Sequence, residues 1–510
     1  MKKLFKALMI LSSFSVLTRA LGFLFRIFLS RLIGAEGLGV YQVAFSVFMV
    51  LETFISSGLP LAVSKRTSAL NSQSIQDRQK ETSMVTSALL IGIFTALFIT
   101  AVVFLFNRCF SWLFTDSRCI KILFILIPSL VFSSVYAVLR GNLWGHKKYF
   151  LVSLTEFVEQ VVRIILTILF LGILNFALDK VFLASISYVI SCIVSSSLVF
   201  LIYFKNGGKI NQKPKDIKSI LHSSVPITMV RVLSSLLSPL IAIIVPMKLV
   251  SLGYTNSQAL SVFGIAMGMT FPLLYIPSTI IGALNMTLIP DLSSSIHIQN
   301  FSEVKNKINF SIKFVYFISF LFIALFFALG VPICQFFYAN SEAGRYLVYS
   351  AILILPISLS SVTISCLNAL DMEIKSFLNY MIGSVALILC ITFLTNYLGI
   401  LSLVWGMGLC LGLASILNMI MIGLKLKDNF SNAKYLLLSI VCSLPTVLIS
   451  KWAYALTIKF LPLFFSLAIS SILGFSFYII FAMIFNLCDL SFLNFRKKSN
   501  NILKIKTIKK

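Results

Sequence analysis

The chain has 510 residues, of which 59% are hydrophobic and only 11% are charged. Soluble globular domains carry about 25% charged residues, so this composition excludes a water-soluble enzyme and indicates a membrane protein. Its 42 lysines and arginines outnumber its 16 acidic residues, which gives a formal charge of +26. In a soluble chain this excess would indicate nucleic acid binding, but in a membrane protein it reports orientation, and we expect no nucleic acid partner.

Apolar runs long enough to cross a bilayer follow one another along the chain, separated by short polar segments. The first six are residues 5–29, 39–64, 82–106, 119–141, 151–174 and 180–204. The next six are residues 219–249, 257–289, 309–330, 345–369, 375–396 and 400–424, and two more follow at 433–456 and 461–486. The first run continues past Arg19 without a small-residue cleavage site, so we interpret it as a retained helix and not as a signal peptide. The sequence therefore predicts an all-α polytopic membrane protein with about fourteen transmembrane helices.

The spacing of these runs predicts the organisation of the chain. We expect an N-lobe of six helices over 1–204, a basic cytoplasmic linker over 205–218, a C-lobe of six helices over 219–424, two further helices over 425–486 and a basic cytoplasmic tail over 487–510. Placing both termini in the cytoplasm puts 28 lysines and arginines in the tails and inward loops, against 8 in the outward loops. This bias predicts cytoplasmic termini, and we expect the protein in a bacterial cytoplasmic membrane.

A weak internal repeat relates the two predicted lobes. The segment SSVYAVLRGNLWGHKKYFL from Ser133 aligns without gaps on SSVTISCLNALDMEIKSFL from Ser360, at a shift of 227 residues. A hydroxyl-bearing residue also precedes a deep arginine in the first and seventh runs, at Arg19 and Arg231. Because six is an even number of crossings, two such copies share an orientation and are related by an axis along the membrane normal. The sequence predicts that they enclose a central cavity.

Three arginines are predicted to lie near the middle of the bilayer. At 1.5 Å per residue, Arg19 lies about 21 Å from the start of its helix, and Arg163 and Arg231 lie about 18 Å from theirs. A lipid-facing arginine at the bilayer centre costs roughly 2.5–3.5 kcal/mol, so we expect these side chains to face the cavity. Arg26 follows Arg19 by seven residues on the same helix face. Arg26 either continues a basic stripe that begins at Arg19, or its side chain reaches out to the outer membrane interface.

Three acidic residues also lie within predicted helices: Glu52, Glu156 and Glu159. Glu159 and Arg163 are spaced i, i+4, so Glu159 either neutralises Arg163 or acts independently of it. Glu52 has no such neighbour in its helix. A carboxylate at that depth is kept neutral, pairs with an arginine of another helix, or carries a coupling proton or cation, and the sequence leaves these alternatives open.

Cofactor motifs are absent from the sequence. No Cys-x-x-Cys pair occurs among the nine cysteines, so no metal site is predicted, and Cys109 with Cys119 is the only pair close enough in one loop to consider as a disulfide. No Gly-x-x-x-x-Gly-Lys-Ser/Thr loop occurs either, which disfavours ATP coupling. We therefore expect no cofactor, and transport driven by Na⁺ or H⁺ coupling or by the membrane potential alone.

Two segments carry a resemblance to a known family. They read LTRALGFLFRIFLSRLIGAEGLGVYQ from Leu17 and SSGLPLAVSK from Ser56, and FVEQVVRI from Phe157 reinforces them. The chain resembles the stage V sporulation protein B and polysaccharide biosynthesis family of the multidrug, oligosaccharidyl-lipid and polysaccharide exporter superfamily, and more distantly the lipid II flippases. The resemblance implies two MATE-like lobes, alternating access and outward movement of lipid-linked sugars. It matches Arg19 and Arg231 to arginines of the lipid II flippases, and Glu52 and Arg26 depart from that pattern.

The preferred hypothesis is a flippase that moves a polyprenyl-pyrophosphate-linked oligosaccharide from the inner to the outer leaflet. The cargo would be a lipid II-like precursor of the cell wall, the spore or a polysaccharide, and membrane lipids and cell-envelope synthesis proteins are the other expected partners. Guanidinium groups suit phosphate oxygens, so the predicted binding residues are Arg19, Arg26, Arg163 and Arg231.

Two alternatives remain at this stage. A cation-coupled multidrug antiporter of the same fold would use Glu52, Glu156 or Glu159 for coupling. A polytopic glycosyl- or acyltransferase would need carboxylates at the membrane edge, for which Asp371 and Glu373 are the only close acidic pair in a loop. Turn residues in solvent explain that pair more simply, so the sequence predicts a transporter and not an enzyme.

Overall fold

The structure is a computed structural model, and it describes residues 2–70, 75–173, 178–210, 214, 217–428, 433–485 and 487. The predicted basic tail lies outside these residues apart from Leu487, and so does part of the predicted linker. Helices account for nearly all of the described chain, which contains no strand. The prediction of an all-α protein is confirmed.

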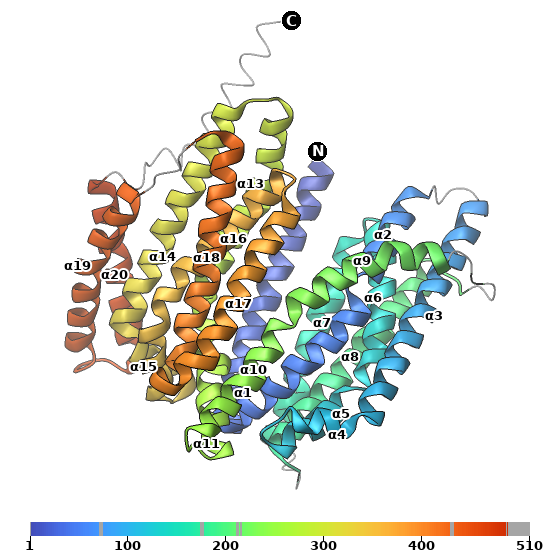
Figure 1. Ribbon diagram of the computed structural model, residues 1–510, viewed down its shortest axis with the longest axis horizontal. Coiled ribbons are helices and arrows are strands. Elements are labelled where there is room, and N and C mark those ends of the chain that lie inside the picture. Colours follow the sequence, from blue (N-terminus) through green and yellow to red (C-terminus); the bar gives the residue numbers. More distant parts are fainter. Residues whose placement is uncertain are drawn as a thin grey trace, which may run out of the picture. The chain divides into compact units, whose positions relative to one another are not determined.

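The chain forms two compact units, each described separately here. Unit 1 comprises Met1–Met269 with Thr395–Ile400, and unit 2 comprises Thr270–Leu394 with Leu401–Lys510. The helices of unit 1 are α1 (Lys2–Ser56), α2 (Leu59–Ala69), α3 (Ile75–Leu105), α4 (Asn107–Trp112), α5 (Ser117–Leu126), α6 (Ser129–Gly145), α7 (Tyr149–Ile168), the π-helix η1 (Leu169–Ile173), α8 (Lys180–Lys205), α9 (Ile217–Ser235), α10 (Leu237–Ser251) and α11 (Asn256–Phe263) (Figure 1). The boundary between the units falls in a second π-helical segment, η2 (Gly264–Thr270).

Local sequence explains where several helices of unit 1 bend or begin. Helix α1 consists of two limbs that meet at a kink at Gly34, whose φ of 72° is a conformation that only glycine adopts readily. The side chain of Asp116 accepts a hydrogen bond from the backbone N–H of Arg118 and so caps α5. Burial alone would raise the pKa of Asp116, but hydrogen bonds from Arg118 outweigh it, and the pKa lies below its ordinary value. Arg118 also bonds Glu36 of α1, which ties α5 to α1.

Helices α2 and α6 pack backbone to backbone. A Cβ atom at Gly141 would lie 2.5 Å from the carbonyl oxygen of Pro60, and one at Gly145 would overlap the side chain of Thr67. Spacing glycines four residues apart on one helix allows such close approach within a membrane. Leu59, Val63, Val138 and other apolar residues of α2, α3, α6 and α8 form the buried cluster beside this contact.

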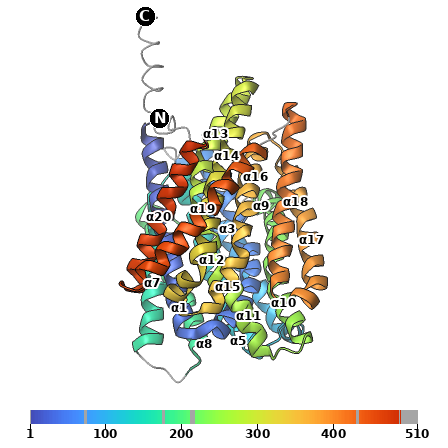
Figure 2. The same ribbon diagram turned by 90° about the vertical axis from the view of Figure 1, so that its left-hand side faces the viewer.

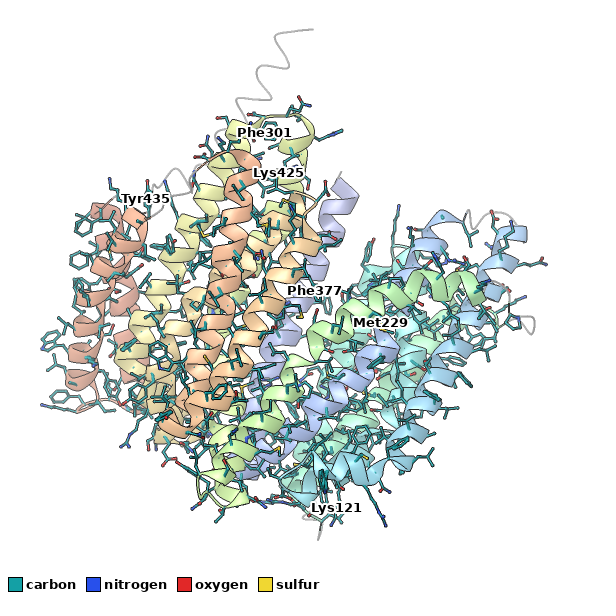
Figure 3. The ribbon with its side chains drawn as sticks, viewed as in Figure 1. Lys121, Met229, Phe301, Phe377, Lys425 and Tyr435 are labelled. Carbon is teal, nitrogen blue, oxygen red and sulfur yellow. The ribbon has the colours of Figure 1, made fainter. Side chains whose placement is uncertain are left out.

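Unit 2 is built around a long central helix. Its helices are α12 (Phe271–Leu274), α13 (Ile276–His297), α14 (Phe301–Tyr338), α15 (Ser341–Ser350), the short 3₁₀ turn η3 (Ala351–Leu353), α16 (Ile354–Ala369), α17 (Glu373–Leu398), α18 (Leu401–Leu426), α19 (Ala433–Thr457) and α20 (Leu463–Ile484). Figure 2 shows α19 and α20 on one side of α14, and α17 and α18 on the other. Tyr435 is labelled near one end of the unit in Figure 3. The centre of its ring lies 3.8 Å from Lys313 Nζ in a cation–π contact.

Fewer helices meet the length and hydropathy requirements of a membrane span than the fourteen predicted apolar runs. Eleven helices of the described residues are long and apolar enough to cross a membrane, or twelve if α5 and α6, which meet at 44°, form one span. The predicted count of fourteen is not confirmed. One candidate, Leu17–Ala69, is 53 residues long and takes in most of the runs 5–29 and 39–64, so these two predicted spans count once. Helix α7 carries Glu156, Glu159 and Arg163, and it is not among the eleven.

The predicted repeat has a structural counterpart at a slightly different register. Helix α6 turns into α7 through Lys147 at φ 59°, and α16 turns into α17 through Asp371 at φ 57°. In both turns a backbone N–H reaches back five residues, from Lys148 to Leu143 and from Met372 to Leu367. These turns are 224 residues apart, and the gapless alignment of the two segments gave 227. The alignment therefore matches composition along the helices but misses the turns by three residues.

Cysteines make no disulfide in the described part of the chain. Cys109 is exposed and Cys119 is buried, and both are free thiols. Cys119 lies with its Sγ 3.8 Å from the carbonyl oxygen of Val40, so it packs in the interface between α5 and α1. The two candidate partners in this loop therefore have different environments.

Candidate functional site

A cavity of about 290 Å³ lies inside unit 1, between α1, α6, α7 and α8. It contains three of the residues that the sequence singled out: Glu52, Glu156 and Glu159. The other lining residues are Thr18, Ser56, Ser133, Tyr136, Ala137, Arg140, Gln160, Cys192 and Ser195. Arg140 is the only cation among these residues, so we call this space the acidic cavity.

Arg163 is held beside the acidic cavity by several neighbours. It forms an ion pair with Glu159, one helical turn earlier on α7, and both side chains are about one-fifth exposed or less (16% and 21%). Its Nε donates to Ser191 Oγ at 3.3 Å, and its guanidinium carbon lies 4.4 Å from the centre of the Tyr188 ring. The i, i+4 spacing alone leaves open whether Glu159 neutralises Arg163. In the structure the two side chains form an ion pair.

Glu159 also reaches the opposite wall of the cavity. Its second carboxylate oxygen accepts a hydrogen bond from Ser195 Oγ on α8 at 2.9 Å. The α7 and α8 helices are therefore joined through one carboxylate, which takes a guanidinium on one oxygen and a hydroxyl on the other. Such a pair is costly to break, because removal of one partner leaves the other charged and only partly solvated.

Glu52 projects from the second limb of α1 into the same space. Its Oε1 accepts a hydrogen bond from Ser133 Oγ of α6 at 2.9 Å, and no ion pair of the described residues involves it. Of the three cavity carboxylates, Glu52 is thus the one that forms no ion pair with an arginine in the described part of the chain.

Arg140 is a cavity residue that sequence reasoning missed. Its Nη1 lies 3.2 Å from Glu156 Oε1, and its guanidinium carbon lies 4.7 Å from the Trp144 ring and 5.4 Å from the Tyr136 ring. Tyr136 and Trp144 precede and follow Arg140 by four residues, and this spacing puts the three side chains on one helix face. That aromatic pattern is the signal available in the sequence, but Arg140 lies at the end of its apolar run, where a basic residue is typical of a membrane boundary.

The remaining predicted arginines lie outside the lining of the acidic cavity. Arg19 and Arg26 are exposed on the first limb of α1, and Arg231 is exposed on α9. Figure 3 shows Met229, two residues before Arg231, about midway along the α9 and α10 path. Arg26 and Arg163 both lie near Tyr41. The structure therefore brings the three acids together around one cavity but does not gather the four arginines into it.

A family comparison places these features in a known group. The model for the family described as "Polysaccharide biosynthesis protein" matches residues 4–295, which is more than half of the chain. The chain belongs to this family. The matched region contains every arginine and carboxylate that the sequence singled out for binding or coupling.

Two proteins of related sequence align with about three quarters of this chain. It is 25% identical over 397 residues to stage V sporulation protein B of Bacillus subtilis (strain 168), covering 74% of this chain and 75% of that protein. It is 22% identical over 422 residues to lipid II flippase MurJ of the same organism, covering 75% and 76% of the two chains. The resemblance predicted from Leu17–Gln42 and its companion segments is confirmed.

Similarity to solved structures shows the fold of this chain. It matches "Lipid II flippase MurJ, inward closed conformation" with a TM-score of 0.72 and 18% identity, covering 94% of this chain and 98% of that one. It matches an inward-facing multidrug resistance MATE family transporter with a TM-score of 0.62 and 15% identity, covering 80% and 94%. The protein is a multi-pass membrane protein with a MurJ- and MATE-like fold.

Proposed function

We propose that this protein is a flippase that carries a polyprenyl-pyrophosphate-linked oligosaccharide from the inner to the outer leaflet by alternating access. The observation that carries the proposal is a pair of arginines without acidic partners. Arg19 on α1 and Arg231 on α9 are both exposed, and neither makes an ion pair within the described part of the chain. An arginine in an apolar helix needs a counter-charge or water, and a pyrophosphate supplies that charge.

The arginines divide into two groups in this proposal. Arg163 is committed to Glu159 and to the Tyr188 ring, so it holds α7 and α8 together and is a weaker candidate for cargo binding. Arg19, Arg231 and the exposed Arg26 remain the candidates for the pyrophosphate. Family membership and the similarity to lipid II flippase MurJ support a lipid-linked cargo, and the sugar and the cell wall, spore or polysaccharide pathway follow only from experiment.

The acidic cavity supplies a second part of the proposed mechanism. A carboxylate bound by a hydroxyl alone, as Glu52 is by Ser133, takes up a proton or Na⁺ more readily than one already paired with an arginine. We assign Glu52 as the coupling residue, with Glu156 and Glu159 as charge-pairing neighbours. Because the cell interior is negative, outward movement of an anion is also favoured by about 2.3 kcal/mol per charge per 100 mV.

The first test is translocation of lipid II by purified protein in proteoliposomes. Each charged hydrogen bond is worth about 1.5–3 kcal/mol. We therefore expect Arg19→Ala and Arg231→Ala each to lower the initial rate at limiting lipid II by roughly 10-fold or more. Arg108→Ala is the matched control, since this exposed arginine lies on the short helix α4 away from the apolar spans. Undiminished translocation in both variants would contradict the proposed role of these arginines.

Ion coupling is tested in the same vesicles with imposed gradients. Glu52→Gln keeps the hydrogen bond to Ser133 but cannot ionise, so we expect the variant to lose the response to a Na⁺ or H⁺ gradient while still responding to a membrane potential. An unchanged gradient response would remove Glu52 from the mechanism. A cation-coupled drug exporter of this fold would instead tolerate Arg19→Ala in a drug-resistance assay, and a transferase would turn over a sugar donor.

A further inference from the structure

A second cavity of unit 1, about 520 Å³ in volume, lies at one end of the bundle. Its wall consists of the first turns of α3, the end of α6 with the start of α7, and the end of α8 with the residues that follow. We call it the end cavity. Its volume falls within the range of about 300–1,000 Å³ that small-molecule sites occupy. It shares no lining residue with the acidic cavity.

The single carboxylate of the end cavity is already engaged by the wall. Glu81 Oε1 accepts a hydrogen bond from Asn142 Nδ2 at 2.6 Å and lies 2.5 Å from His146 Nε2. Asn142 is 3% exposed and Glu81 13%, so this network forms the buried floor of the cavity. The charge of Glu81 thus serves to fix α3 against α6.

Three cations line the same cavity: Arg78, Lys148 and Lys209. Lys148 Nζ donates to Asn206 Oδ1 at 2.5 Å, a neutral acceptor that leaves the ammonium charge uncompensated. Within the described residues, neither Lys148 nor Lys209 forms an ion pair. With the one lining carboxylate engaged by Asn142 and His146, Lys148 and Lys209 give the cavity a preference for an anionic group.

The position of the cavity indicates what kind of anion it meets. Four helix ends surround it, so it lies at the depth where spans leave the hydrocarbon and phospholipid phosphates reside. The lining residue Tyr203 is buried, and its ring lies 5.7 Å from that of Phe204, which is 41% exposed. Phe204 in turn contacts Phe200 one turn earlier, at 4.7 Å between ring centres. A basic cavity beside exposed aromatic surface suits an amphiphile better than a soluble ion.

We propose that the end cavity binds the phosphate of an anionic phospholipid, with Lys148 and Lys209 at the phosphate oxygens and Phe204 against the acyl chains. This site is separate from the proposed cargo site, and it takes a bilayer lipid and not the transported molecule. A water-soluble phosphate shares the headgroup chemistry but would make no use of the aromatic surface.

The test measures the thermal midpoint of the full-length protein in nonionic detergent during titration with phosphatidylglycerol, phosphatidylcholine or glycerol 3-phosphate. We expect phosphatidylglycerol alone to raise the midpoint. At about 1 kcal/mol per lysine near an anionic surface, Lys148→Ala with Lys209→Ala should weaken the apparent affinity roughly 10- to 30-fold. Lys148→Arg with Lys209→Arg keeps the charge and should keep most of the binding.

A matched control separates the cavity from general surface charge. Lys65→Ala with Lys218→Ala removes the same charge from the adjoining ends of α2 and α9, which Arg66 and Ser219 join, and neither lysine lines the cavity. This variant should bind phosphatidylglycerol as the unaltered protein does. Equal loss in the control, no preference over phosphatidylcholine, or an equal effect of glycerol 3-phosphate would each overturn the proposal. The lipid II translocation assay is independent of this result, so failure here leaves the proposed transport function standing.

Discussion

The two units stabilise their polar interiors in different ways. In unit 1, several polar contacts between helices involve a charged group, as in the hydrogen bond from Ser195 of α8 to Glu159 of α7 and the ion pair of Arg140 on α6 with Glu156 on α7. In unit 2 the fully buried polar contacts between helices are neutral, and its ion pair of Lys305 with Asp428 is about one-third exposed. Asn418, fully buried on α18, accepts from Asn379 Nδ2 on α17 at 2.9 Å and donates to Thr363 Oγ1 on α16 at 3.2 Å. One asparagine thus joins three helices without a formal charge.

This difference separates two uses of polarity inside a membrane protein. A buried amide that is fully hydrogen-bonded fixes helix register at modest cost, whereas a buried ion pair costs desolvation and contributes little net stability. Charged groups inside a membrane protein therefore contribute little to stability, and those of unit 1 are the ones to which the proposed function assigns ion coupling. Unit 2, on this view, owes its polar contacts to packing. Three substitutions test the comparison.

The largest expected effect is that of Arg163→Ala. It leaves Glu159 partly buried with only Ser195 as a partner, so we expect a loss of about 3–5 kcal/mol in stability, seen as a lower thermal midpoint in detergent. The double variant Arg163→Ala with Glu159→Gln removes both charges and should recover most of the loss. If the double variant is as unstable as the single one, packing of the arginine stem and not its charge is the cause.

An intermediate effect is expected for Asn418→Ala in unit 2. The change leaves the buried Asn379 amide without its acceptor and opens a small void, which together should cost about 1–3 kcal/mol. Thr363 retains its hydrogen bond to the carbonyl oxygen of Ser360, so its hydroxyl stays satisfied. Replacing Asn379 and Asn418 together by leucine should be milder than the alanine variant. If the double leucine variant loses more stability than Asn418→Ala, the two amides contribute more than their hydrogen bond to each other.

The smallest effect is expected for Glu156→Gln beside Arg140. Glu156 is 43% exposed in its ion pair, and exposed pairs contribute about 0–1 kcal/mol, so the thermal midpoint should barely move. Arg140 keeps its stacking on Trp144 in this variant. A shift as large as that of Arg163→Ala would show that the two ion pairs of the acidic cavity are equivalent, which contradicts the distinction drawn from their exposure.

The sequence predicted those features that depend on neighbours within one helix. Apolar runs predicted the helices because bilayer compatibility is a property of each segment, and the i, i+4 spacing anticipated the contact of Glu159 with Arg163. Contacts between helices were not accessible in this way. Ser133 lies 81 residues from Glu52, and Asn418 lies 55 residues from Thr363, so each depends on how separate helices pack. The kink in α1 has a local origin, because Gly34 adopts a φ of 72° between the first two apolar runs.

The glycine contact between α6 and α2 has a consequence for both cavities. Arg140, in the acidic cavity, and Asn142, in the floor of the end cavity, are two residues apart on α6. Because Gly141 lies directly on the backbone of Pro60, this part of α6 can slide or rotate only together with α2. A ligand that displaces this helix pair from either cavity would alter affinity at the other by the same factor, since linkage is reciprocal. The bilayer composition would then become an effector of transport, acting through one shared helix pair.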